Sequence, residues 1–230
     1  MPRRSLQRMG PLVWHVMNRA IQGLTLFEHP NEYEAFLAIL GPAVRDHRIE
    51  LFAYCVMPNH FHLVVRASAG AKLSDFMQVL TTRHAQQWRV ETRTSGRGAV
   101  YQGRFLAMPV QADGHFLRVC RYVERNPVRA TLVTRAEQWI WSSAWDLAHD
   151  RDDRRPALAP WPVARPIDWT SLLASVAIPS LDLAIRRAMR RGLPYGSTDW
   201  QTRTLGTTSE GRRLRGRPHD APARKTVSPK

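Results

Sequence analysis

Cysteine, acidic residues and long apolar runs are all scarce in this chain of 230 residues. The two cysteines, Cys55 and Cys120, lie far apart in apolar segments, which favours reduced core thiols over a disulfide framework. No run approaches the roughly 18–20 apolar residues of a membrane span. The basic start, Met1–Arg4, is not followed by the apolar segment of a signal peptide. We therefore expect a cytoplasmic protein.

The chain is strongly basic, with 34 lysines and arginines against 19 aspartates and glutamates and a formal net charge of +15. An excess of this size favours a polyanionic partner. Because the arginine fork matches phosphate geometry and stacks on bases, we expect nucleic acid rather than a membrane, and hence association with the nucleoid. The hydrophobic fraction of 43% is sufficient for a packed core. Charge alone does not separate an enzyme from a nucleic-acid-binding protein.

Hydrophobic periodicity predicts the order β-α-β-β-α-β, followed by one more helix. The expected strands cover 11–20, 49–56, 60–65 and 105–110, and the expected helices cover 31–47, 73–91 and 114–126. This order is typical of an α+β, ferredoxin-like split βαβ fold with an antiparallel four-stranded sheet. We expect the helices on one face of the sheet, which leaves the other face free for a ligand.

The run Met57-Pro58-Asn59-His60-Phe61-His62 places two histidines at alternate positions of a predicted strand. Side chains at i and i+2 of a strand point to the same face, about 6–7 Å apart. His60 and His62 are therefore able to converge on one metal ion, while Phe61 faces a core. Two histidines at this spacing also occur by chance as core or surface residues, so the rest of the site decides between the two interpretations.

A reacting group is offered by the segment from Cys120 to Ala130. Tyr122 and Asn126 are i and i+4 on the predicted helix, so their side chains share a face. If that face lies over the sheet, Asn126 supplies an oxygen ligand and Tyr122 points at a metal-bound phosphate. Two imidazoles and one amide oxygen leave open positions, which favours Mg²⁺ or Mn²⁺ over a closed structural Zn²⁺ site. Asn126 precedes Pro127, however, and a simple helix C-cap is the alternative.

Four blocks of the chain together resemble the REP-associated tyrosine transposases, which belong to the single-tyrosine HUH transposases. They are Tyr54–Val65, Tyr101–Phe105, Tyr122–Ala130 and Trp141–Ser143. The resemblance implies a ferredoxin-like fold, metal binding by His60, His62 and Asn126, and Tyr122 as the nucleophile. It also implies cleavage of single-stranded DNA beside a short hairpin, with a 5′-phosphotyrosine and a free 3′-OH as products. Tyr101 departs from the family's frequent tryptophan and is the alternative nucleophile.

The resemblance and the charge pattern also indicate DNA-binding residues. Asn18 and Arg19 match an Asn-Arg pair of the family, with a structural turn as the alternative. Arg215 and Arg217, in an Arg-Gly-Arg-Pro sequence, resemble the minor-groove element of AT-hooks, with a solvated tail as the alternative. Further candidates for phosphate contact are Arg93, Arg97, Arg104 and Arg129.

Composition divides the chain into three parts. Residues 1–148 form the expected HUH transposase catalytic domain, residues 149–200 a tryptophan- and proline-rich wrap with a basic helix near 180–193, and residues 201–230 a basic tail that we expect to be disordered. The family includes dimers that exchange the tyrosine helix. The long C-terminal appendage favours a monomer, with a dimer as the alternative.

Three functions fit the same residues. The first is a metal-dependent DNA nicking and joining enzyme, and the second is a non-catalytic protein that binds structured DNA or RNA with its basic face. A third possibility is a phosphodiesterase that uses water in place of a tyrosine. Only the first predicts a covalent protein–DNA adduct that requires a divalent metal.

Overall fold

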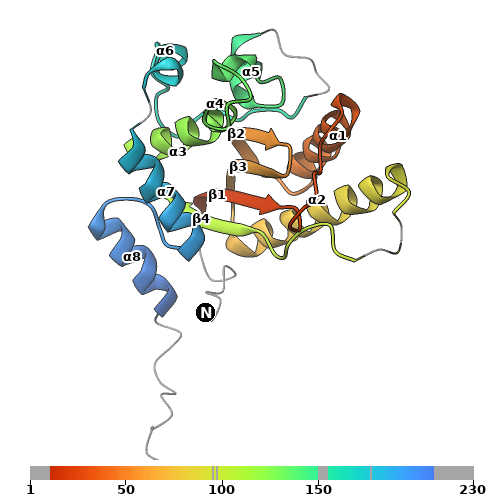
Figure 1. Ribbon diagram of the computed structural model, residues 1–230. Coiled ribbons are helices and arrows are strands. Elements are labelled where there is room, and N and C mark those ends of the chain that lie inside the picture. Colours follow the sequence, from red (N-terminus) through yellow and green to blue (C-terminus); the bar gives the residue numbers. More distant parts are fainter. Residues whose placement is uncertain (1–10, 95, 97, 150–154, 177, 210–230) are drawn as a thin grey trace, which may run out of the picture.

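The computed structural model describes residues 11–94, 96, 98–149, 155–176 and 178–209. Its first half contains β1 (Leu12–Arg19), α1 (Pro30–Asp46), β2 (Glu50–Met57), β3 (His60–Ala67), α2 (Gly70–Glu91), β4 (Leu106–Val110) and α3 (Gly114–Glu124). The strands form one antiparallel sheet in the order β2-β3-β1-β4 (Figure 1). This order confirms the predicted ferredoxin-like split βαβ fold.

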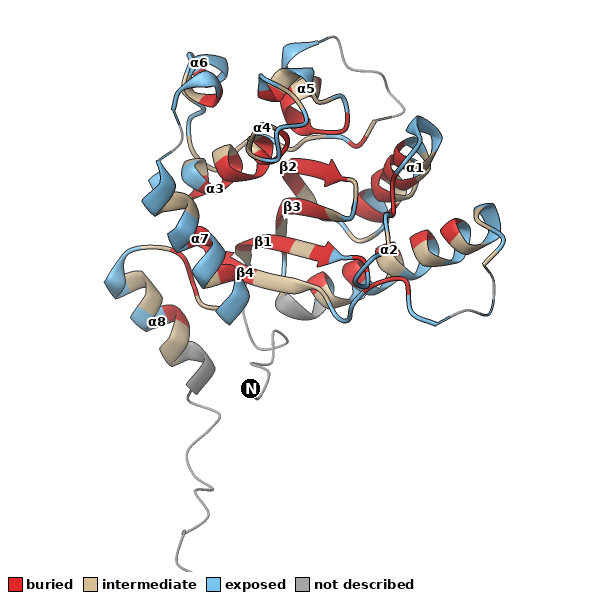
Figure 2. Cartoon of the chain, in the orientation of Figure 1, coloured by how far each residue is buried: buried red, intermediate tan, exposed pale blue. Residues whose placement is uncertain are grey.

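One face of the sheet is covered by α1 and α2. Alternate residues of the strands, such as Trp14 on β1 and Phe61 and Leu63 on β3, point into this core. Phe36 of α1 and Phe76 of α2 meet them, and all five side chains are fully buried. Figure 2 shows the buried side of each helix turned toward the strands. The apolar alternation of β1 and β3 thus determines which face receives these helices.

The other face is covered as well, and the expectation of a free sheet face is wrong. Helix α3, α6 (Trp169–Ala174) and α7 (Pro179–Arg191) pack over it (Figure 1). Trp169, Ile185 and Met189 from the appendage join sheet residues such as Val13 and Val64 in a second core. These strands are apolar on both sides, and apolar surface on the second side is stabilised by burial.

The segments that follow α3 also cover both edges of the sheet. Along the β2 edge, the indole N–H of Trp139 donates to the carbonyl of Val56 at 2.8 Å, and that of Trp161 donates to Phe52 at 3.0 Å. At the β4 edge, the backbone N–H of Tyr195 donates to the carbonyl of Pro109 at 2.8 Å. Edge strands carry unpaired backbone groups, and these contacts satisfy some of them. These tryptophans and the Tyr195 backbone therefore anchor the segments that follow α3.

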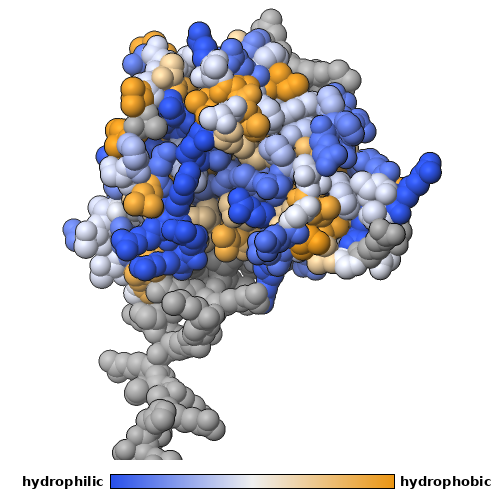
Figure 3. All heavy atoms as spheres, viewed as in Figure 1, coloured by the Kyte–Doolittle hydropathy of each residue, from blue (hydrophilic) through white to orange (hydrophobic). Residues whose placement is uncertain are grey.

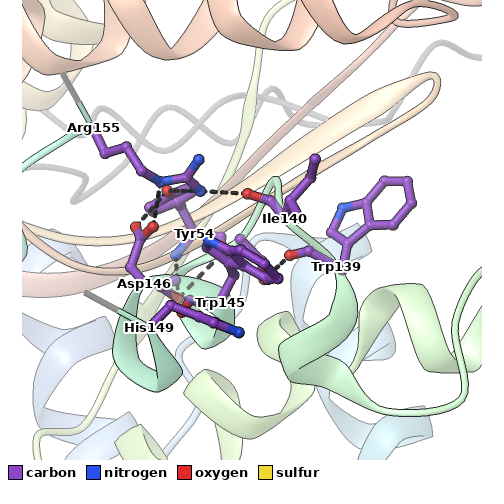
Figure 4. Close-up of polar contacts among 9 residues, drawn as sticks. Tyr54, Trp139, Ile140, Trp145, Asp146, His149 and Arg155 are labelled. Atoms are coloured by element: carbon purple, nitrogen blue, oxygen red, sulfur yellow. Dashed lines mark hydrogen bonds and ion pairs between the residues drawn. The ribbon is translucent and has the colours of Figure 1, made fainter. Parts of the chain in front are cut away.

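A buried polar network holds the start of this wrap against β2 (Figure 4). The hydroxyl of Tyr54 donates to Asp146 at 2.5 Å. Arg155 donates to the same carboxylate, to the Tyr54 oxygen and to the carbonyl of Ile140. Asp146 belongs to α5 (Ser143–Ala148), so one network joins β2, α5 and the residues beyond 154.

Three described elements remain, and two of them, α4 (Asn126–Arg129) and α8 (Thr198–Ser209), show that a predicted boundary was wrong. The third is the 3-10 helix η2 (Ala136–Gln138). The tail expected to be disordered from residue 201 is helical as far as Ser209, and residues 210–230 lie outside the described residues. The predicted helix over 114–126 ends at Glu124, because Pro127 lacks the N–H that would continue it. Within the described ranges, no helix has the length and apolar character to cross a membrane.

Candidate active site

The strand register places both histidines on the face covered by α3. His60 pairs with Arg19 and His62 with Met17 across β3 and β1, while the intervening Phe61 points into the opposite core. The imidazole ring centroids of His60 and His62 are 5.0 Å apart, with the ring planes at 87°. The expected convergence of the two side chains on one side of the sheet is therefore present.

Each histidine uses its Nδ1 atom for a contact inside the protein. Nδ1 of His60 lies 2.7 Å from Oδ1 of Asn59, and Nδ1 of His62 lies 2.9 Å from Nε2 of His15 on β1. In both rings this leaves Nε2 for a ligand. Metal-bound histidines are commonly oriented in this way by a bond at the other nitrogen.

Burial keeps both rings neutral. It lowers the pKa of His60 to about 4, with the positive charges of Arg19 and Arg129 acting in the same direction. The pKa of His62 falls well below its usual value, first because of burial and then because of the neighbouring His60 and His15. A histidine must be neutral to bind a metal, so both rings have the charge that metal binding requires near pH 7.

Helix α3 brings Tyr122 over the histidines. The helix begins after Asp113, whose side-chain oxygen accepts a hydrogen bond from the backbone N–H of His115 at 2.8 Å. The Tyr122 ring centroid lies 6.0 Å from that of His62 and 5.8 Å from that of His15, both in edge-on geometry. The candidate nucleophile Tyr122 therefore lies beside the candidate metal ligand His62 of the same chain.

Asn126 begins α4 instead of continuing the helix of Tyr122, and Arg129 joins the two residues. One Arg129 nitrogen donates to Oδ1 of Asn126 at 2.6 Å, and another donates to the backbone carbonyl of Tyr122 at 3.3 Å. The Arg129 guanidinium also lies 4.0 Å from the centre of the Tyr122 ring. Asp182 of α7 forms an ion pair with Arg129 at 3.5 Å. One arginine therefore spans the ligand candidate, the tyrosine and α7.

The donor atoms fit an open cation site. The candidate ligand atoms are Nε2 of His60, Nε2 of His62 and Oδ1 of Asn126, which accepts one hydrogen bond from Arg129 and retains a second lone pair for a cation. The part of the chain that is described contains no cluster of three or more His, Cys, Asp or Glu side chains arranged for a metal. The available set is two imidazoles and one amide, which is too few ligands for a closed structural site.

The other predicted DNA contacts are scattered. Arg19 lies beside His60, whereas the buried Asn18 pairs with Phe61 on the α1/α2 side and bonds its neighbour's backbone. Arg93, directly after α2, and Arg104, before β4, are exposed. Arg97, Arg215 and Arg217 lie outside the described residues.

Two further residues are buried and form hydrogen bonds. Tyr101, the alternative nucleophile, is buried in the α1/α2 core, where its hydroxyl lies 2.6 Å from Nδ1 of His84. Glu124, which lies on α3, is fully buried and accepts hydrogen bonds from Ser143 and Trp169. Tyr101 therefore does not belong to the site of His60 and His62, and Glu124 links α3 to α5 and α6.

A family model described as "Transposase IS200 like" matches residues 11–126, which is half of the chain and includes the histidine strand and the tyrosine helix. The chain belongs to the IS200-like transposase family. A solved structure of a REP-associated tyrosine transposase bound to a REP hairpin is similar to this transposase, with a TM-score of 0.53 and 18% identity over 73% of this chain and 92% of that chain. That likeness shows a shared fold. No curated protein sequence matches the chain.

The sequence of this transposase did not reveal the contact of His15 with His62 or the bridging contacts of Arg129. Arg129 was expected only to contact phosphate. The alternation of β1 puts His15 on the same face as Arg19, which is a signal in the sequence. Its pairing with His62 depends on the register between β1 and β3, which the sequence does not show.

Proposed function

We propose that this transposase nicks and joins single-stranded DNA beside a hairpin, with Tyr122 as its nucleophile. The observation that carries the proposal is the position of the Tyr122 ring against His62, on the face where both Nε2 atoms remain for a ligand. The tyrosine hydroxyl loses its proton as its oxygen attacks phosphorus, the phosphorus–O3′ bond breaks, and the O3′ atom takes up a proton, so no proton is gained or lost overall. The resulting 5′-phosphotyrosine conserves the bond energy for rejoining.

His60, His62 and Asn126 would hold the divalent cation that this chemistry needs. When bound, the cation neutralises a phosphate oxygen and polarises the phosphorus. Two imidazoles and one amide oxygen leave positions for phosphate oxygens and water, so Mg²⁺ and Mn²⁺ are both candidates. Arg129 holds the Asn126 oxygen and the Tyr122 backbone in one unit, and so keeps ligand and nucleophile in a fixed relation.

Helix α7 provides a basic surface beside this site. Ile185 and Met189 face the core, while the opposite side carries four exposed arginines: Arg186, Arg187, Arg190 and Arg191. Figure 3 shows hydrophilic side chains following α7 along this face. The ion pair between Asp182 and Arg129 fixes the helix next to Tyr122. We assign these arginines to phosphates of the DNA strand or hairpin, in line with the hairpin bound to the solved relative.

A monomer is sufficient for this chemistry. Tyr122 lies against His15 and His62 of its own chain, and α3 packs on its own sheet. An exchange of the tyrosine helix between two copies is therefore not needed to complete the site. Size-exclusion chromatography with light scattering tests this directly, and active monomer is the expected result.

The test of the function is a denaturing-gel assay with labelled single-stranded hairpin oligonucleotides from the DNA that flanks the gene. The full chain should form a denaturant-resistant adduct with Mn²⁺, EDTA should abolish it, and Tyr122→Phe should not form it. Tight binding without any adduct would favour a non-catalytic DNA-binding protein. Cleavage that survives in Tyr122→Phe would instead indicate a phosphodiesterase that uses water.

A further inference from the structure

We propose that His15 is a positioning residue for the cation site, because its contact with His62 selects which nitrogen of His62 faces the cation. The inference rests on the proposed function, since it concerns the metal ligand of that same site. His15 would bind neither cation nor DNA. It would act only through His62 and the neighbouring Tyr122.

The geometry places His15 directly behind the ligand candidate. His15 lies on β1, is fully buried, and faces the same side of the sheet as His62 on β3. Its Nε2 atom is 2.9 Å from Nδ1 of His62, and the two ring centroids are 5.0 Å apart. A buried histidine–histidine contact of this length requires one ring to donate and the other to accept.

Only one of the two possible arrangements permits His62 to bind a cation. If Nδ1–H of His62 donates to Nε2 of His15, the lone pair of His62 lies on Nε2, toward the site. If Nε2–H of His15 donates instead, His62 carries its own proton on Nε2 and is not a ligand there. The shared hydrogen bond therefore couples the tautomer of His15 to the ligand state of His62.

The far nitrogen of His15 follows the state of His62. Nδ1 of His15 is buried and has no hydrogen-bond partner among the described residues. In the ligand-competent arrangement this atom carries a proton, and in the other arrangement it carries a lone pair, so it has no partner in either one. A cation at Nε2 of His62 is compatible only with the first arrangement, so binding fixes the tautomers of both rings together.

His15 also contacts the nucleophile. Its ring lies edge-on to Tyr122, with centroids 5.8 Å apart. Loss of the His15 ring would leave a space behind both His62 and Tyr122, so their relative position would become less defined. A residue that only filled the core would not affect affinity for a cation.

The first experiment measures Mn²⁺ binding by titration calorimetry for the full chain and three variants. His15→Leu should bind Mn²⁺ about 10–100-fold more weakly, the usual effect of losing a residue that orients a metal ligand. His15→Gln should recover most of the affinity, because its amide oxygen accepts a hydrogen bond from Nδ1 of His62. His84→Leu is the matched control, because it removes a buried histidine from the opposite core and should bind Mn²⁺ like the wild type.

A second measurement needs no variant. Nitrogen-15 NMR of the histidine rings reports the tautomers of His15 and His62 before and after addition of Zn²⁺, a diamagnetic ion that imidazole binds. We expect the protons of both rings to lie on Nδ1 when the ion is bound. Wild-type Mn²⁺ affinity in His15→Leu, or a His62 proton on Nε2 in the loaded protein, would overturn the inference alone. Failure of the wild type to bind Mn²⁺ would overturn the proposed cation site and the inference with it.

Discussion

Both faces of the sheet hold a tyrosine next to a buried histidine, but the surroundings of the two pairs differ. On the α1/α2 face, the Tyr101 hydroxyl bonds Nδ1 of His84, and the phenyl rings of Phe27 and Phe36 pack against that imidazole. On the α3 face, Tyr122 lies beside His62 and under the guanidinium of Arg129.

The comparison shows that adjacency of the two residue types does not make a catalytic pair. Burial raises the pKa of Tyr101, and its hydroxyl is already committed to His84, so this tyrosine is not suited to attack a phosphate. Tyr122 instead adjoins His62, whose Nε2 atom is left for a ligand, and the positive charge of Arg129, which is the environment that a polyanionic substrate needs. One face serves mainly stability, and the other holds the proposed active site.

The largest expected effect separates the two tyrosines. Tyr122→Phe should abolish the covalent adduct, because no oxygen remains to attack phosphorus. Tyr101→Phe should form the adduct at close to the wild-type rate and lose only stability, because His84 is left without its partner. The denaturing-gel assay with Mn²⁺ measures both. An adduct that persists in Tyr122→Phe and disappears in Tyr101→Phe would reverse the assignment of the two faces.

The second prediction concerns the buried carboxyl group of the α3 face. Burial raises the pKa of Glu124 from 4.5 to about 7, although hydrogen bonds from Ser143 and Trp169 oppose the shift. The folded state then holds this proton more tightly than the unfolded state. The free energy of unfolding therefore decreases as pH rises from 4.5 to about 7, by on the order of 3 kcal/mol from this group.

Glu124→Gln removes this titration and keeps hydrogen-bonding groups for both partners. Its stability advantage over the wild type should grow between pH 4.5 and about 7 and then remain constant, as measured by urea unfolding at a series of pH values. Glu124→Leu, the control, leaves the Trp169 N–H and the Ser143 hydroxyl without this acceptor and should be destabilised at every pH. A difference between Glu124→Gln and wild type that does not vary with pH would contradict the prediction.

The third prediction tests the bridge formed by Arg129. Lysine retains the charge in Arg129→Lys, but it cannot hold the Asn126 oxygen, the Tyr122 carbonyl and Asp182 at once. Loss of one charged hydrogen bond, about 1.5–3 kcal/mol, corresponds to a rate of adduct formation about 10–100-fold lower. Arg125→Lys is the matched control, because Arg125 contacts carbonyls at the end of α6. Equal rates for the two variants would show that the bridge does not position the nucleophile.

The smallest expected effect concerns surface charge on the two sides of the molecule. The double variant Arg187→Gln/Arg191→Gln removes two exposed charges from α7, while Arg45→Gln/Arg83→Gln removes two from α1 and α2. The first should lower the slope of log affinity for hairpin DNA against log salt by about two, and the second should leave it nearly unchanged. Fluorescence anisotropy at several salt concentrations measures both. Equal slopes for the two variants would remove α7 from the DNA-binding surface.

Local sequence pattern was enough to predict the strands, the order of the elements and the face that His60 and His62 share. The reason is that strand alternation has a period of two, so the apolar Phe61 and Leu63 determine the direction of their neighbours. The i, i+4 spacing likewise indicated that Tyr122 and Asn126 lie near each other. It did not reveal that Pro127 separates them into two helices and that Arg129 reconnects them.

The sequence by itself therefore determined the ferredoxin-like order of elements, the basic character and the histidine–tyrosine pattern. Only the tertiary structure decided that the appendage covers the second face, that Tyr101 belongs to the opposite core, and that His15 lies behind His62. Each of these depends on contacts between residues distant in the chain, such as Trp161 with Phe52 or His15 with His62. Such contacts follow from strand register and from the burial of apolar surface over the whole molecule, which no local window of sequence contains.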